Sequence, residues 1–118
     1  MSDINNLINE ITETLKEGGV EKVILFGSYA KGTAGEESDL DIIVVTSDDF
    51  FPSSNREKME LHHKYNNLIR NFRKQVPIDM IVYTRLMYNN VMESGSMFAR
   101  ELRLTGKTLY EAAYKGMA

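Results

Sequence analysis

Apolar and polar positions alternate along the chain with two different periods. Over residues 3–17 the apolar side chains recur at the three- and four-residue spacing of one helical face, at Ile4, Leu7, Ile8, Ile11 and Leu15. Ser2 or Asp3 can cap the start of this segment, and Gly18 with Gly19 supplies a stop at its end. The pattern predicts an amphipathic helix.

Three runs rich in β-branched residues predict strands, at residues 20–26, 39–46 and 78–83. The second run is apolar on both faces after its first residues, which is typical of a central strand covered on both sides. Only about a dozen residues separate the first two strands, which is short for a right-handed parallel crossover. We therefore expect these two strands to be antiparallel and the sheet to be mixed.

The remaining apolar positions have helical spacing. Residues 56–75 predict the longest helix, and one or two further helices are expected from Thr84 onward, ending at Gly106. Residues 107–110 then predict a short edge strand. The whole pattern predicts a single α+β domain over residues 1–118, a two-layer arrangement with a small mixed sheet of three to four strands flanked by helices.

Composition narrows the class of protein. A chain of 118 residues suits one compact domain, and the lack of cysteine excludes zinc–thiolate sites and thiol chemistry. With a net charge of −3 and dispersed basic residues, nucleic acid is disfavoured as the main substrate. No apolar run approaches the ~20 residues of a membrane span, so we expect a cytoplasmic protein with no membrane association.

Acidic side chains interrupt two of the predicted strands. Asp39 and Asp41 are two residues apart, so their side chains leave the same face of a strand. Asp79 stands in an otherwise apolar run, where a charge is costly unless it is paired or bound to a metal. Three carboxylates on neighbouring strands would repel one another, and a divalent cation relieves that repulsion. Oxygen ligands select Mg²⁺ or Mn²⁺ over zinc.

A second candidate feature, Gly27-Ser28, follows the first predicted strand. Glycine lets the backbone approach a phosphate closely, and a following helical turn offers free amide hydrogens to an anion. The Ser28 hydroxyl adds a donor, and Lys31 is placed to contact the same phosphates. Taken singly, a Gly-Ser turn is ordinary loop punctuation and Asp39 could begin a strand or cap a turn. The combination, in this order on three predicted strands, favours a functional site.

The two motifs together resemble the signature of a known family. Residues 27–32 (GSYAKG) followed by residues 38–44 (SDLDIIV) resemble the signature of the polymerase-β-type nucleotidyltransferase superfamily, and its minimal nucleotidyltransferase (MNT) subgroup in particular. The resemblance implies a nucleotidyltransferase fold and an enzyme that transfers a nucleoside monophosphate, by default AMP from ATP, with release of pyrophosphate. It implies that Asp39, Asp41 and Asp79 are the catalytic residues and hold two Mg²⁺ ions.

The resemblance also implies roles for the Gly-Ser turn and for a partner. Gly27, Ser28 and Lys31 would bind the nucleotide. In this family MNT proteins are commonly paired with small helical HEPN proteins as toxin–antitoxin modules, so a HEPN-type partner or a homo-oligomer is expected to complete the acceptor site. A binding module that neutralises its partner without catalysis remains the alternative from a different functional class. An antibiotic-modifying enzyme would need more chain to form its substrate pocket.

Overall fold

The computed structural model describes residues 3–112 of the chain. The order of elements is α1 (Asp3–Glu17), β1 (Lys22–Phe26), α2 (Gly27–Lys31), β2 (Leu40–Val45), α3 (Asn55–Ile69), the 3-10 helix η1 (Arg70–Lys74), β3 (Ile78–Tyr83), α4 (Arg85–Glu93), α5 (Met97–Thr105) and β4 (Lys107–Glu111). None of the helices in this described part is long and apolar enough to cross a membrane.

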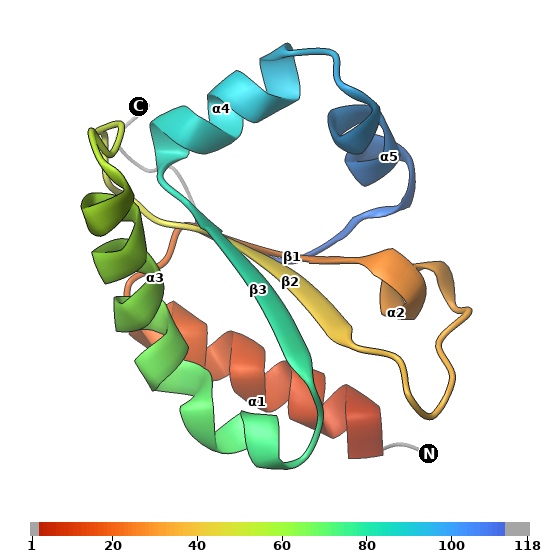
Figure 1. Cartoon of the computed structure of the whole chain (residues 1–118). Helices are drawn as coiled ribbons and strands as arrows, with labels where there is room; N and C mark the ends of the chain where they lie inside the picture. The colour runs from red at the N-terminus through yellow and green to blue at the C-terminus, as the bar shows by residue number, and fades with distance from the viewer. Residues whose placement is uncertain (1–2, 113–118) are drawn as a thin grey trace.

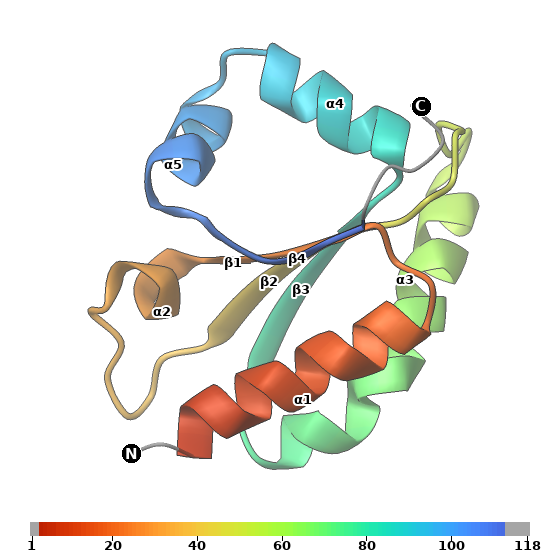
Figure 2. The same ribbon diagram turned by 180° about the vertical axis from the view of Figure 1, so that it is seen from behind.

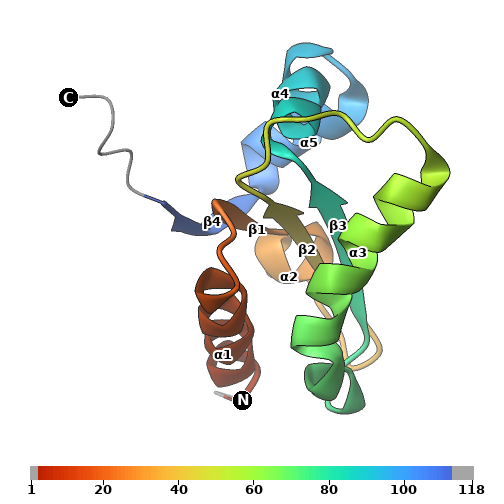
Figure 3. The ribbon, with the colours of Figure 1, turned by 90° about the vertical axis from the view of Figure 1, so that its left-hand side faces the viewer.

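The strands form one mixed sheet in the order β3-β2-β1-β4. β1 is antiparallel to both of its neighbours, and β2 is parallel to β3. The predicted antiparallel pairing of the first two strands is therefore confirmed, as is the return of residues 107–110 as an edge strand. Figure 3 shows the strands side by side, with β4 and β3 outermost.

Helices lie on both faces of the sheet (Figures 1 and 2). α1 and α3 cover the face into which Leu40, Ile42 and Val44 of β2 point, and together they form the larger core. On the other face Ile43 and Val45 pack in a smaller cluster that includes Leu102 of α5. The alternate residues of β2 are apolar too, so α4 and α5 add a partial layer to the predicted two-layer arrangement.

Local signals explain where the later helices begin and end. The Ser54 hydroxyl accepts a hydrogen bond from the Glu57 amide at the start of α3, and Thr84 and Ser96 cap α4 and α5 in the same way. The predicted helix at 56–75 is α-helical only to Ile69 and then tightens into the 3-10 helix η1, as helix ends often do. Pro77 follows shortly after and disfavours a helical conformation in the residue before it.

The connection between β1 and β2 prepares the site. α2 follows β1 without an intervening loop, and Gly32 directly follows its last residue, with a φ of 79° in the left-handed conformation common at helix ends. The predicted turn into a short helical segment at 27–32 is thus confirmed. β2 then returns antiparallel to β1, so the end of β1 lies beside the start of β2.

Candidate active site

Strand pairing brings the Gly-Ser turn and two of the predicted aspartates together. Phe26, the last residue of β1, pairs with Asp41 of β2, and Asp41 pairs with Asp79 of β3. Neighbouring strands are about 4.7–4.9 Å apart, and paired residues point to the same face. Phe26, Asp41 and Asp79 therefore lie in one row across the sheet, on the face that α4 and α5 cover in part, and Gly27 directly follows the first of them.

Asp39 and Asp79 lie on the rim of this row. Asp39 directly precedes β2 and is exposed, and its side chain shares the face of Asp41 two residues on. The expectation that a charge at Asp79 is costly, because its neighbours along the chain are apolar, is wrong. Among the described residues β3 pairs with β2 alone, so it is an outermost strand and its Asp79 is exposed. An acid at this position costs less than the sequence suggested.

Asp41 is the half-buried member of the set. Burial raises the pKa of the Asp41 carboxyl above its ordinary value, and the nearby carboxylates of Asp79 and Asp39 raise it further. Within residues 3–112 none of the three aspartates has a salt bridge or a side-chain hydrogen bond. Like charges without a compensating cation are electrostatically unfavourable, so positive charge at this point would stabilise the ionised forms.

The chemistry of these side chains fits a hard divalent cation. All the donors are carboxylate oxygens, the type that Mg²⁺ and Mn²⁺ prefer. In the described part of the chain no three His, Asp or Glu side chains already form a group that could hold a metal. Two of the three aspartates are exposed, and exposed side chains change rotamer within nanoseconds. Rotation of these two side chains is thus available to bring their carboxylates toward a cation held by Asp41.

Gly27 is required by its conformation and by its contact with Asp41. Its φ of +74° is the left-handed region that other residues rarely adopt. A Cβ at this position would lie 2.1 Å from Asp41 Oδ2, closer than any real contact. Ser28 follows in the first turn of α2, where backbone amides have no helical partner. The Gly-Ser turn thus directly adjoins the central carboxylate.

Lys31, the third predicted nucleotide ligand, has a partner that the sequence did not reveal. Its Nζ lies 2.6 Å from Oε2 of Glu101, a residue of α5. Glu101 also lines a cavity of about 210 Å³ next to Gly27, together with Phe26 and Phe98. No motif marks Glu101, because its relevance comes only from the packing of α5 beside α2.

The candidate site lies within the part of the chain that matches a known protein family. The model of the family described as "Nucleotidyltransferase domain" matches residues 6–94, which include the Gly-Ser turn and all three aspartates. The chain belongs to the nucleotidyltransferase domain family. Residues 95–112, which form α5 and β4, lie beyond the match, so Glu101 comes from outside the part of the domain that the family model covers.

Individual relatives agree with this family. A Methanocaldococcus jannaschii protein named "Putative protein adenylyltransferase" is 50% identical over 46 residues, covering 36% of this chain and 46% of its own length. The matched stretch thus spans about half the length of that relative. Two solved structures share the fold. One is a toxin–antitoxin structure with AMP-PNP, with a TM-score of 0.53 and 24% identity, covering 88% of this chain and 73% of that one. The other is a Sulfolobus solfataricus "putative nucleotidyltransferase", with a TM-score of 0.56 and 20% identity, covering 94% of this chain and 88% of that one.

Proposed function

We propose that this domain transfers a nucleoside monophosphate from a nucleoside triphosphate to a hydroxyl group, with ATP as the donor and a partner protein as the acceptor. The family supports nucleotidyl transfer. The naming of relatives as protein adenylyltransferases supports AMP and a protein acceptor, and the neighbour crystallised with the ATP analogue AMP-PNP supports ATP. The acceptor oxygen forms a bond to the α-phosphorus, the bond to the bridging β-phosphate oxygen breaks, and pyrophosphate leaves with the electron pair.

The residues of the site divide this work. Gly27 lets the backbone approach the β- and γ-phosphates, and Ser28 donates its hydroxyl and amide to them. Lys31 balances part of their charge. Asp39 and Asp41 would hold Mg²⁺, with Asp79 as a further ligand or as the acceptor of the hydroxyl proton. Two bound Mg²⁺ ions would neutralise charge on the attacking and leaving oxygens.

The observation that carries this proposal is the contact between Gly27 and Asp41. A phosphate held at the amides after Gly27 lies beside the carboxylate that would hold the cation, so the two halves of the site act on one triphosphate. The order of the two motifs along the chain does not require this contact; the pairing of β1 with β2 creates it.

Label transfer tests the proposal. The protein is incubated with its candidate partner, Mg²⁺ and ATP labelled either at the α- or at the γ-phosphate. We expect label on the partner from α-labelled ATP alone, because γ-label leaves with pyrophosphate. No transfer with Mg²⁺ or Mn²⁺ would overturn the proposal, and transfer of γ-label would identify a phosphotransferase instead.

A binding module is the second candidate. Met97 and Leu104 of α5 are 85% and 79% exposed and lie seven residues apart, on the same side of the helix. Exposed apolar side chains on one face favour a protein interface, and a structural neighbour is part of a toxin–antitoxin pair. We propose a helical HEPN-type toxin as the partner. If Asp39→Asn with Asp41→Asn leaves neutralisation of that toxin unchanged, complex formation suffices.

A further inference from the structure

The Gly-Ser turn and the helical turn after it, residues 27–32, contain one basic residue, and that residue forms an ion pair with a residue of α5. Lys31 is the only Lys or Arg within residues 27–32, and its ammonium is paired with the Glu101 carboxylate at 2.6 Å. α2 and α5 lie on the same side of the molecule, at the right in Figure 1, and their residues are in contact. The ion pair therefore joins the proposed phosphate site to an element that follows it far along the chain.

We propose that Glu101 is a positioning residue. Its carboxylate stays paired with the Lys31 ammonium until a bound triphosphate takes the place of that carboxylate. Each bound triphosphate must draw the Lys31 ammonium away from the Glu101 carboxylate. Glu101 thereby lowers the affinity of the site for phosphates that use Lys31. This inference rests on the proposed function, since it assumes that Lys31 contacts the nucleotide.

The exposure of the pair makes this exchange possible. The side chains of Lys31 and Glu101 are 40% and 58% exposed, so water and salt screen their attraction. Exposed pairs of this kind contribute little to stability. A triphosphate carries several negative charges, so it competes successfully with one carboxylate for the Lys31 ammonium.

The position of Glu101 adds a second effect. Glu101 lines the cavity beside Gly27 and also a second surface pocket of about 320 Å³ that Lys31 and Arg100 line as well. Once Lys31 turns to the phosphates, the Glu101 carboxylate is left near an anion without its partner. Both effects oppose binding, and neither acts on the chemical step.

The test compares Glu101→Gln with Glu111→Gln. Glu111 is a matched control, because it is 61% exposed and pairs with Lys22 at 3.3 Å at the opposite end of β1. Calorimetry measures the Kd of inorganic tripolyphosphate, ATP and adenosine for each variant. We expect Glu101→Gln to bind tripolyphosphate and ATP about 1.5- to 5-fold more tightly than wild type, the range of an exposed ion pair. Adenosine binding and the Glu111→Gln variant should show no change.

Two further measurements test positioning. In a Lys31→Gln background Glu101→Gln should lose its effect on tripolyphosphate affinity, because the competition no longer exists. In the transfer reaction Glu101→Gln should lower the KM for ATP and leave kcat unchanged. Glu101→Ala should behave in the same way if the amide of glutamine adds no contact of its own.

The outcomes separate this inference from the proposed function. Transfer by wild type with equal affinities in Glu101→Gln and Glu111→Gln overturns the role of Glu101 and leaves the function standing. Tighter tripolyphosphate binding by Glu101→Gln without any transfer supports the role of Glu101 and overturns the function. Failure of wild type to bind tripolyphosphate or ATP overturns both.

Discussion

At the carboxyl end of β2 acidic side chains meet an arginine, whereas at its amino end they meet one another. The strand is only six residues long, Leu40–Val45, so both arrangements lie within one small sheet. They differ in whether the fold supplies a positive charge for the acids that it gathers.

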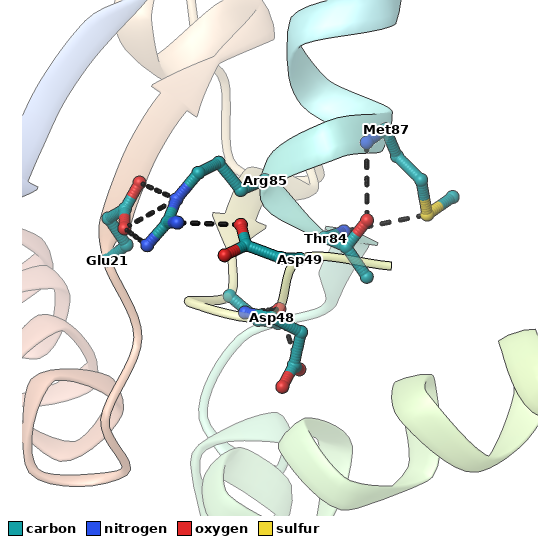
Figure 4. A network of polar contacts seen from close by, with 7 residues as sticks. Glu21, Asp48, Asp49, Thr84, Arg85 and Met87 are labelled. Atoms are coloured by element: carbon teal, nitrogen blue, oxygen red, sulfur yellow. Dashed lines mark hydrogen bonds and ion pairs between the residues drawn. The ribbon is translucent and has the colours of Figure 1, made fainter. Parts of the chain in front are cut away.

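The carboxyl end is held together by Arg85, the first residue of α4 (Figure 4). Its guanidinium donates to both carboxylate oxygens of Glu21, with Nε at 3.0 and 3.1 Å, and Nη1 donates to Asp49 at 2.6 Å. Thr46 donates to Asp48 at 2.9 Å, and the Arg85 amide donates to the Asp48 carbonyl. The acids of this end thus link the residue before β1, the start of α4 and the loop after β2.

The amino end has no such cation among the described residues. Asp39, Asp41 and Asp79 lie near one another without a salt bridge, and Lys31, the basic residue of the adjoining Gly-Ser turn, is paired with Glu101 instead. An acid that the fold pairs with a cation lowers stability only when that cation is removed, whereas an acid that the fold leaves uncompensated lowers stability from the start and can bind a cation. The contrast assigns a structural role to one end of β2 and supports a catalytic role for the other.

The largest effect should come from removing the uncompensated acids. Asp39→Asn with Asp41→Asn removes two proposed ligands, and we expect nucleotidyl transfer to fall by at least about 100-fold, since even indirect partners of metal ligands cost up to that much. Transfer of label from α-labelled ATP measures it. Asp49→Asn carries the same change of charge per residue at the other end and should retain transfer; equal losses in both would remove the distinction between the two ends.

The contact between Gly27 and Asp41 should be the next most sensitive. Gly27→Ala combines an unfavourable φ with a Cβ 2.1 Å from Asp41 Oδ2. We expect a loss of about 1–3 kcal/mol in the free energy of unfolding from the conformation alone, and lower transfer because the carboxylate is displaced. Urea unfolding and the transfer assay measure the two effects.

Two glycines serve as controls for this prediction. Gly32 also has a positive φ, but a Cβ there meets nothing within 4 Å, so Gly32→Ala isolates the cost of conformation. Gly35 has neither feature, and Gly35→Ala should change neither stability nor transfer. A Gly27→Ala variant that loses no more than Gly32→Ala would show that the approach to Asp41 is unimportant.

Removing the arginine at the carboxyl end of β2 should lower the stability of the protein and leave nucleotidyl transfer unchanged. Arg85→Ala leaves Glu21 and Asp49 without their shared cation, and Arg85 and Glu21 are only 26% and 21% exposed. We expect the free energy of unfolding to fall by about 1–3 kcal/mol, with transfer per folded molecule unchanged. Arg85→Lys should restore only part of it, because an ammonium does not reproduce the paired contacts of a guanidinium. A variant as stable as wild type would contradict the structural role.

The smallest effect is a dependence of stability on pH at Asp41. Because the pKa of Asp41 in the folded protein is raised above 3.8, the folded state binds more protons than the unfolded state just above that pH. The free energy of unfolding should therefore fall as pH rises from 3.8 through the folded pKa, and this loss persists at neutral pH. Asp41→Asn removes it.

Thermal melts between pH 3 and pH 8 without divalent cations test the sign of this dependence. The expected difference in melting temperature between wild type and Asp41→Asn is on the order of a few degrees. We expect Asp41→Asn to melt above wild type at neutral pH and to converge with it in acid. Asp49→Asn, which loses a salt bridge, should melt below wild type at neutral pH. Added Mg²⁺ should raise the melting temperature of wild type more than that of Asp41→Asn; the reverse order would argue against a cation at Asp41.

Much of the fold could be predicted because its local signals are strong. The period of apolar residues located α1, and residues 78–83 form β3 as predicted. The turn at Gly27 and the antiparallel return of β2 followed from glycine and from a short connection. The predicted helix at 56–75 is α-helical only to Ile69 and continues as η1, where Arg73 makes hydrogen bonds to Asn66 and to the carbonyl of Ile78 that the local pattern did not reveal.

The sequence by itself determined which residues can bear the chemistry: two aspartates two residues apart must share a face of a strand, and a glycine before a helical turn can admit a phosphate. Only the tertiary structure decided their surroundings. It made β3 an outermost strand and so exposed Asp79, and it set Glu101 against Lys31. Local periodicity depends on backbone geometry over a few residues, whereas ion pairs and strand neighbours depend on contacts between segments distant in the chain.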